Sequence, residues 1–168
     1  MTLVIAPVTG PEDGRAAVGL IRDFFDWLAG RYPELEALIA EYFEKQGIEA
    51  ELDALSEGRT HPGGLCLLAR LNGAPAGLLM MKPVTDSLCE MNRMYVADSA
   101  RGHGVARALA ARLFDEARKS GFTEMRLEAL DAHHEALPLY LSLGFSDDPD
   151  PTEFALSNPR VVSMRRAL

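Results

Sequence analysis

The sequence predicts an α/β fold, a three-layer sandwich in which helices cover both faces of a mixed sheet of about six or seven strands. Two strand-like runs flank Asn72-Gly73, a strong hairpin signal, and a third run follows, which predicts an antiparallel meander. A strand, a long amphipathic helix and another strand then occupy about residues 88–130, which implies a right-handed crossover and a parallel pair. The 168 residues are 48% hydrophobic and contain no linker or low-complexity tract, so one domain over 1–168 is the simplest interpretation.

The first third of the chain is predicted to form one strand and two helices. Leu3–Val8 is an apolar run that Thr9-Gly10-Pro11 closes. Residues 12–29 carry apolar side chains at helical spacing. A second helical stretch begins at Pro33, which suits a first turn, and ends at Gly47.

The remaining two thirds are predicted to alternate between strands and helices. The predicted strands cover residues 65–71, 76–81, 87–96 and 125–130, with closing strands within 151–168. The predicted helices cover about residues 105–120 and 133–143. Pro138 costs little if the second of these helices begins near residue 134, because the proline then lies near the first turn.

The run Arg101-Gly102-His103-Gly104-Val105-Ala106 joins a strand to the long helix. Glycines at such a turn leave backbone N–H groups without internal partners at the positive end of the helix dipole, which makes a cradle for a phosphate. The run lacks the Gly-Lys pair of the phosphate-binding loop of nucleotide triphosphatases. It fits two glycines of the dinucleotide fingerprint but has Arg107 in place of the third, which argues against a nicotinamide-dependent enzyme.

Two motifs in this half of the chain lie in a fixed order. Arg101, Gly104 and Ala106 fit the pattern Arg/Gln-x-x-Gly-x-Gly/Ala, and residues 136–145 fit A-x-x-L-Y-x-x-x-G-F. Both resemble motifs of the GNAT superfamily of acyl-CoA-dependent N-acyltransferases, and the resemblance to its small bacterial members extends over roughly residues 65–165. It implies the GNAT-like sandwich, with acetyl-CoA as co-substrate in a splayed V between the central parallel strands.

The resemblance also implies catalytic roles. Tyr140 corresponds to the tyrosine that protonates the departing thiolate of coenzyme A, and a phenol with a pKa near 10 stays protonated at neutral pH. Glu90 is the first candidate for the base that activates the amine, directly or through water, and Glu128 on the neighbouring strand is the second. Strict alternation would place Glu90 on one face with Asn92 and Met94, and would place Met91, Arg93 and Tyr95 on the other.

Further residues are expected to bind acetyl-CoA. Backbone groups of Met94 and Val96 should bond the pantetheine arm as an added strand would, and an amide near Tyr95 could support the oxyanion. His133 stands where relatives often have an asparagine that contacts this arm. Together with the loop, the candidate cofactor-binding residues are Met94, Tyr95, Val96, Arg101, Gly102, His103, Gly104, Val105, Ala106 and His133.

Composition argues against several other kinds of protein. The 17 basic and 25 acidic residues give a net charge of −8, which disfavours a nucleic-acid surface and could favour a cationic amine substrate. Cys66 and Cys89 form no C-x-x-C unit and are expected to be small buried hydrophobes, and no metal site is predicted. No basic leader precedes the apolar N-terminal run and no run of 18 apolar residues occurs, so a cytoplasmic protein without a membrane partner is expected.

The predicted function is transfer of an acetyl group from acetyl-CoA to a primary amine by direct attack in a ternary complex. The alternative is a non-catalytic acyl-CoA-binding module that senses the cofactor or serves as a structural partner, and His133 and Pro138 are the departures that favour it. The residues leave the acceptor open between a small amine, an amino acid, a peptide N-terminus, a lysine and an antibiotic. Homodimers are common in the superfamily, but these residues do not indicate the oligomeric state.

Overall fold

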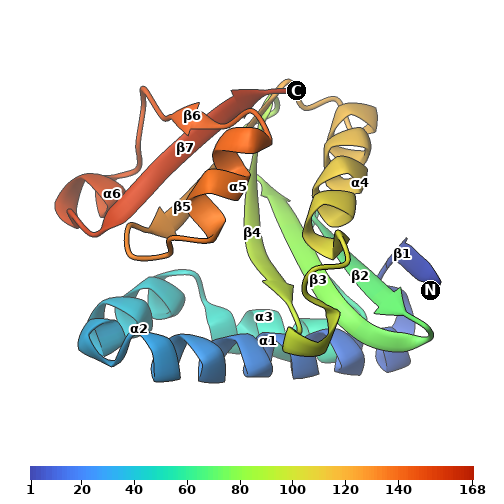
Figure 1. The fold of residues 1–168 in the computed structure, drawn as a ribbon. Helices are drawn as coiled ribbons and strands as arrows, with labels where there is room; N and C mark the ends of the chain where they lie inside the picture. The colour runs from blue at the N-terminus through green and yellow to red at the C-terminus, as the bar shows by residue number, and fades with distance from the viewer.

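The computed structural model describes residues 1–168 as a seven-stranded sheet with helices on both faces (Figure 1). The strands lie in the order β1-β2-β3-β4-β5-β7-β6. Their bounds are Leu3–Pro7 (β1), Leu65–Leu71 (β2), Ala74–Pro83 (β3), Leu88–Val96 (β4), Glu124–Leu130 (β5), Ser146–Asp147 (β6) and Val161–Ala167 (β7). Strands β4 and β5 are parallel and every other pair is antiparallel, so the predicted α/β sandwich with a mixed sheet is confirmed.

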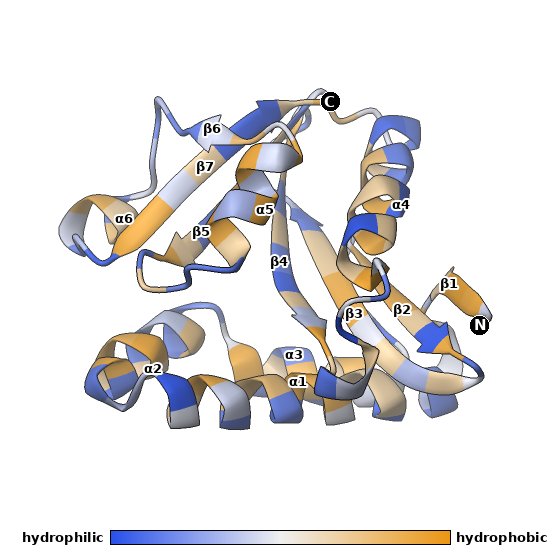
Figure 2. Cartoon of the chain, viewed as in Figure 1, coloured by the Kyte–Doolittle hydropathy of each residue, from blue (hydrophilic) through white to orange (hydrophobic).

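The sheet separates two hydrophobic cores, and helices cover each of them. The bounds of the helices are Gly10–Arg31 (α1), Glu36–Lys45 (α2), Ile48–Ser56 (α3), Val105–Lys119 (α4), Ala136–Ser142 (α5) and Glu153–Ser157 (α6). Buried side chains of α1 and α3 share one core of 11 residues, whereas those of α4 and α5 belong to the other, of 21. Figure 2 shows the amphipathic colouring that this packing requires, with hydrophilic residues on the outer side of α4. None of the helices combines the length and apolar character needed to cross a membrane.

The predicted helix from Pro33 to Gly47 is wrong in its extent. Residues Pro33–Leu35 form a 3-10 turn, α2 follows, and Gly47 with φ 68° turns the chain directly into α3, which the sequence analysis missed. Helix α3 packs closely on α1. The two helices lie so near each other at Gly14 that a Cβ atom there would collide with the Leu55 carbonyl oxygen. Helix α3 also holds part of the sheet in place, because its residue Glu51 accepts a hydrogen bond from Arg93 of β4.

Two further boundaries differ from expectation. The closing segment 151–168 contains α6 and one strand, β7, since the Thr152 side chain caps a short helix by accepting from the Ala155 N–H at 3.1 Å. Helix α5 begins at Ala136, three residues later than predicted. Pro138 is therefore the third helical residue, and its expected place in the first turn is confirmed.

A β-bulge in β4 changes which side chains face which core. Leu78 of β3 pairs with Tyr95 and Met80 pairs with Asn92, so two residues of β4 oppose one of β3. Arg93 at the bulge has φ 56°, in the left-handed region. The predicted alternation is therefore wrong beyond Asn92: Arg93 reaches Glu51 of α3 and Tyr95 joins the α1 core, both on the side opposite Met91.

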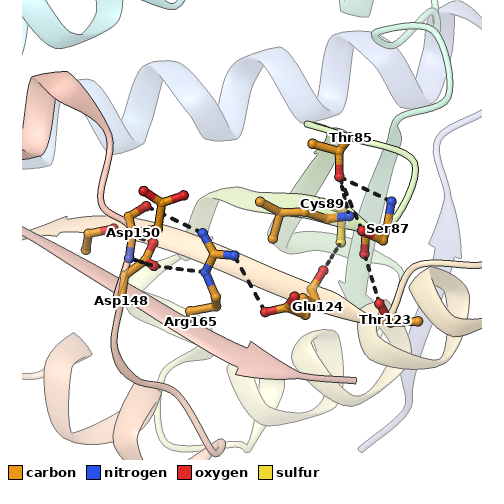
Figure 3. Close-up of polar contacts among 10 residues, drawn as sticks. Thr85, Ser87, Cys89, Thr123, Glu124, Asp148, Asp150 and Arg165 are labelled. Atoms are coloured by element: carbon orange, nitrogen blue, oxygen red, sulfur yellow. Dashed lines mark hydrogen bonds and ion pairs between the residues drawn. The ribbon is translucent and has the colours of Figure 1, made fainter.

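Strands β4 and β5 form a V. They pair only over Leu88–Glu90 and Glu124–Arg126, and beyond those residues they separate, as Figure 1 shows. Figure 3 shows the polar contacts at the paired end, where the Cys89 thiol lies 3.6 Å from the Glu124 carbonyl oxygen. The guanidinium of Arg165 bridges Glu124 and Asp148 there, at 3.5 and 2.9 Å. The closed end of the V is thus tied to β7, and the open end is free to form a site.

Candidate active site

The loop before α4 presents a row of free backbone donors. The N–H groups of residues 102–107 donate no hydrogen bond within the protein, and the first helical bond runs from the Ala108 N–H to the Gly104 carbonyl at 3.1 Å. Gly102 and Gly104 have φ values of 79° and 75°, a conformation that L side chains rarely adopt. Six free amides at the N-terminus of the 15-residue helix α4 have the geometry that an anion cradle requires.

Side chains of the same loop fix its shape. The His103 Nδ1 lies 3.2 and 3.0 Å from the carbonyl oxygens of Ala100 and Arg101, so this nitrogen carries the proton and donates. Arg101 pairs with Asp98 at 2.7 Å, donates from Nε to the Val96 carbonyl at 3.2 Å, and lies over the Trp27 ring. The His103 ring therefore stabilises the loop, while its backbone amide stays available to a phosphate.

A groove leads from this loop to Tyr140. Its lining includes Phe24 and Trp27 of α1, and Leu139 of α5. The candidate cofactor-binding residues that line it are Met94, Tyr95, Val96, Arg101, Ala106 and His133. Gly102, His103, Gly104 and Val105 do not line the groove, and they contribute the amides of the cradle at its end. Because β4 loses its neighbour β5 after Glu90, its edge along the groove offers backbone groups to an extended ligand.

A second, mainly apolar cavity adjoins the groove. Fourteen of its eighteen lining residues are hydrophobic, and they come from α1, α2, β4, β5, α5, α6 and β7. The other four are Asn92, Arg93, Glu128 and His133, and the hydroxyl groups of Tyr42 and Tyr140 add further polar atoms to the lining residues. The groove and the cavity share Phe24, Met94, His133 and Tyr140. Two ligands could therefore meet at these four residues, one from each side.

Tyr140 is a suitable proton donor at this junction. It is 8% exposed, on α5, and its ring lies edge-on to Phe145 at 6.2 Å between centroids. Burial raises the pKa of Tyr140 to about 12. The hydroxyl is therefore protonated throughout the neutral range.

The two candidate carboxylates occupy different positions. Glu90 is 4% exposed and lines neither the groove nor the cavity, and its carboxylate lies 3.8 Å from both the Lys82 ammonium and the Arg126 guanidinium. Glu128 lines the cavity, where Oε1 accepts from Thr152 at 3.1 Å and the buried Oε2 has no partner. Burial, followed by the nearby charge of Glu90, raises the pKa of Glu128.

His133 lies just before α5 and belongs to both spaces. Its ring is 5.2 Å from that of Trp27 and 6.3 Å from that of Tyr32. Burial lowers its pKa, so the imidazole is neutral at physiological pH. A neutral ring can present one donor and one acceptor nitrogen to a bound ligand.

The cysteines take no part in the site. Cys66 and Cys89 are free and buried, as predicted. Burial raises the pKa of the Cys89 thiol to about 12 and raises that of Cys66 as well, so neither forms a thiolate at neutral pH. No group of three or more His, Cys, Asp or Glu side chains is arranged to hold a metal ion.

Sequence reasoning missed several residues of the groove and of the cavity wall. Phe24 and Trp27 lie one turn apart on α1 and show their aromatic side chains to the groove, but their spacing is that of any core-facing helix. Arg93 was assigned to the wrong face because nothing in its neighbourhood marks the bulge. The one sequence signal that could have indicated these wall residues is the cluster of aromatic residues in the first two helices.

Comparisons with known proteins agree with this geometry. The family model described as the acetyltransferase (GNAT) family matches residues 21–145. An uncharacterized N-acetyltransferase of Escherichia coli K12, YjgM, is 30% identical over 125 residues, which cover 67% of this chain and 75% of the relative. The PaiA N-acetyltransferase of Thermoplasma acidophilum, in complex with coenzyme A, aligns with a TM-score of 0.74 at 19% identity over 100% of both chains.

A GNAT family acetyltransferase of Elizabethkingia anophelis with acetyl-CoA bound aligns with a TM-score of 0.64 at 17% identity, over 99% of this chain and 98% of that one. The free amides, the open strand edge and the groove fit a long ligand with a phosphorylated end, and the fold and site define an acyl-CoA-dependent N-acyltransferase. The chain belongs to the GNAT family of acetyltransferases, and the sequence resemblance is confirmed.

Proposed function

We propose that this chain transfers the acetyl group of acetyl-CoA to a primary amine by direct attack in a ternary complex. The observation that carries the proposal is the junction of groove and cavity at Tyr140, which would bring cofactor and acceptor to one proton donor. The inert cysteines give no support to a covalent acyl-enzyme route.

The backbone is proposed to hold the cofactor. The amides of residues 102–107 would bind the pyrophosphate, and the open edge of β4 at Met94 and Val96 would hydrogen-bond the pantetheine arm. An amide beside Tyr95, next to the bulge, would stabilise the negative charge that develops on the thioester oxygen. The His133 ring, which also lines the groove, would contact the same arm.

Two proton transfers complete the proposed reaction. The amine nitrogen forms a bond to the thioester carbon and gives up a proton to a carboxylate, and the carbon–sulfur bond then breaks as the Tyr140 hydroxyl protonates the sulfur. Glu128 is placed to accept the amine proton because it lines the cavity and its raised pKa makes it a stronger base than an ordinary carboxylate. Glu90 is proposed to act through Glu128, by raising that pKa.

Two measurements test the proposal. The first is thermal stabilisation by acetyl-CoA, coenzyme A, NAD and ATP, and the second is thiol release from acetyl-CoA with a panel of amines. A ligand at about 100 times its dissociation constant adds roughly 2.7 kcal/mol to the folded state. We expect stabilisation by both coenzyme A species and thiol release with at least one amine. Stabilisation without transfer to any amine would instead support the acyl-CoA-binding module, and no stabilisation by either coenzyme A species would exclude both functions.

A further inference from the structure

Unpaired polar atoms point to the acceptor. Three buried side-chain N or O atoms have no hydrogen-bond partner: Arg93 Nη2, Arg126 Nε and Glu128 Oε2. Arg93 and Glu128 both line the apolar cavity. Because folded proteins rarely leave buried polar atoms unpaired, an unpaired donor on one residue of the cavity wall and an unpaired acceptor on another point to a ligand that satisfies both.

Arg93 is held in place with one nitrogen to spare. Its side chain is 2% exposed, Nε donates to Glu51 at 2.9 Å, and Nη1 donates to Gln46 at 2.5 Å. The guanidinium also lies over the Phe43 ring at 5.1 Å. Its φ of 56° is costly for a residue with a side chain, and such outliers persist where the surroundings enforce them. The guanidinium is therefore preorganised to donate from Nη2.

Glu128 supplies the complementary group. Thr152 occupies Oε1, so Oε2 remains to accept from an amine. Apart from Asn92, His133 and the hydroxyl groups of Tyr42 and Tyr140, the other cavity walls are hydrophobic, and they include the rings of Phe43 and Phe154. Such walls suit an apolar group and would leave a second cationic or strongly polar group on the ligand without a partner.

Resting on the proposed function, we propose that the acceptor is an α-amino acid with a branched aliphatic or aromatic side chain. Its amine lies between Glu128 and the thioester, its carboxylate accepts from Arg93 Nη2, and its side chain packs against the apolar walls. A free carboxylate is favoured over the carbonyl of a peptide because a guanidinium bonds more strongly to an ionised acceptor.

Matched acceptors test this proposal in the unmodified protein. Leucine and isoamylamine differ only in the carboxylate, as do phenylalanine and phenethylamine. We expect kcat/KM for each amino acid to exceed that of its decarboxylated partner at least about tenfold, since a hydrogen bond to a charged group is involved. Leucine amide and a leucyl peptide should fall between the two.

The outcomes separate this inference from the function beneath it. Equal or faster transfer to the decarboxylated amines would overturn the inference and leave an acetyltransferase of apolar amines. Transfer to the leucyl peptide alone would also overturn it, in favour of a peptide N-terminus. No transfer to any of these compounds or to the general amine panel, despite stabilisation by acetyl-CoA, would overturn the proposed function itself.

A pair of variants locates the discrimination. Arg93→Gln removes the guanidinium at the cavity, and the ratio between leucine and isoamylamine should fall to near one. Glu51→Gln changes a partner of Arg93 that does not line the cavity, and should keep most of the ratio. Stabilisation by acetyl-CoA reports whether each variant is folded. A folded Arg93→Gln protein with an unchanged ratio would overturn the assignment.

Discussion

The two halves of the site are built from different materials. The proposed cofactor half consists largely of backbone: free amides in residues 102–107 and the open edge of β4. The proposed acceptor half, the apolar cavity, consists of side chains from seven elements, among them Arg93, Glu128 and the aromatic residues of α1 and α2. A backbone site constrains the sequence only through conformation, whereas a side-chain site changes chemistry with each substitution. One scaffold can therefore keep its cofactor while its acceptor varies.

Tyr140 belongs to both halves, so its replacement should have the largest effect. Tyr140→Phe removes the hydroxyl that we propose as the proton donor to the sulfur, and we expect kcat to fall about 100-fold or more with little change in acetyl-CoA affinity. Tyr32→Phe is the matched control, because Tyr32 is also buried but lines neither space. Steady-state kinetics and cofactor titration measure both. Full turnover in Tyr140→Phe would show that sulfur needs no acid from this residue.

In the acceptor half, kcat/KM should depend on pH through the carboxylate that accepts the amine proton. Glu128 accepts a proton only when ionised, so kcat/KM should fall as the pH falls through its pKa, which lies above that of an ordinary carboxyl. Glu128→Gln should remove this limb and lower kcat/KM about 100-fold. Glu90→Gln removes one cause of the raised pKa, so the limb should move to lower pH while activity remains.

The pH profiles of the two variants distinguish the candidate bases. If Glu90 contacts the amine itself, or through water, Glu90→Gln would lose the limb and Glu128→Gln would keep it. The glutamine variants conserve shape, so stabilisation by acetyl-CoA should match that of the unmodified chain in both. A loss of that stabilisation would show that the change disturbed the fold and not the proton transfer.

In the cofactor half, a change of backbone freedom should matter more than a change of chemistry. Gly104→Ala places a Cβ on a residue with φ 75°, which costs roughly 1 kcal/mol and rotates the free amides, and we expect acetyl-CoA to bind about tenfold more weakly. Gly73→Ala is the control, since Gly73 has φ 86° in the hairpin between β2 and β3. It should lose similar stability and no affinity, as calorimetry with acetyl-CoA would show.

The same contrast explains what the sequence could predict. The glycines of the loop and the A-x-x-L-Y-x-x-x-G-F segment are local patterns, so the cradle, α4 and the position of Tyr140 followed from residues close together in the chain. The meander and the parallel pair followed from a hairpin turn and a crossover, which are also local. These features fix the cofactor half.

The acceptor half depends on contacts between distant residues. The bulge at Arg93 is stabilised by Glu51 and Gln46, more than 40 residues earlier, and no neighbour in β4 announces it. Helix α3 follows α2 after a very short turn at Gly47. In the sequence, this glycine indicated the end of one helix but not the start of the next. Which glutamate reaches the cavity depends on how far β4 and β5 separate, and alternation along one strand does not contain that information.

The smallest effect on activity is expected at Asp148, which bonds to β7 and lines neither the groove nor the cavity. Burial alone would raise the pKa of Asp148, but bonds from the Asp150 N–H, Arg165 and Ser163 hold it below its ordinary value. The resulting stabilisation is present above the ordinary aspartate pKa of about 3.9 and is lost as the pH falls through the depressed value. Asp148→Asn should therefore destabilise the fold by roughly 1 kcal/mol at pH 7.

Urea unfolding at pH 7, 4 and 3 measures this difference. It should shrink as the pH falls, because the unmodified Asp148 also becomes neutral there. Asp147→Asn is the control, since Asp147 is the neighbouring residue and its carboxylate is exposed. Acetyl-CoA affinity and turnover should stay unchanged, because Asp148 lines neither the groove nor the cavity. A deficit that is the same at every pH would mean that the shape of the hydrogen-bond network, and not its charge, holds β6 and β7 together.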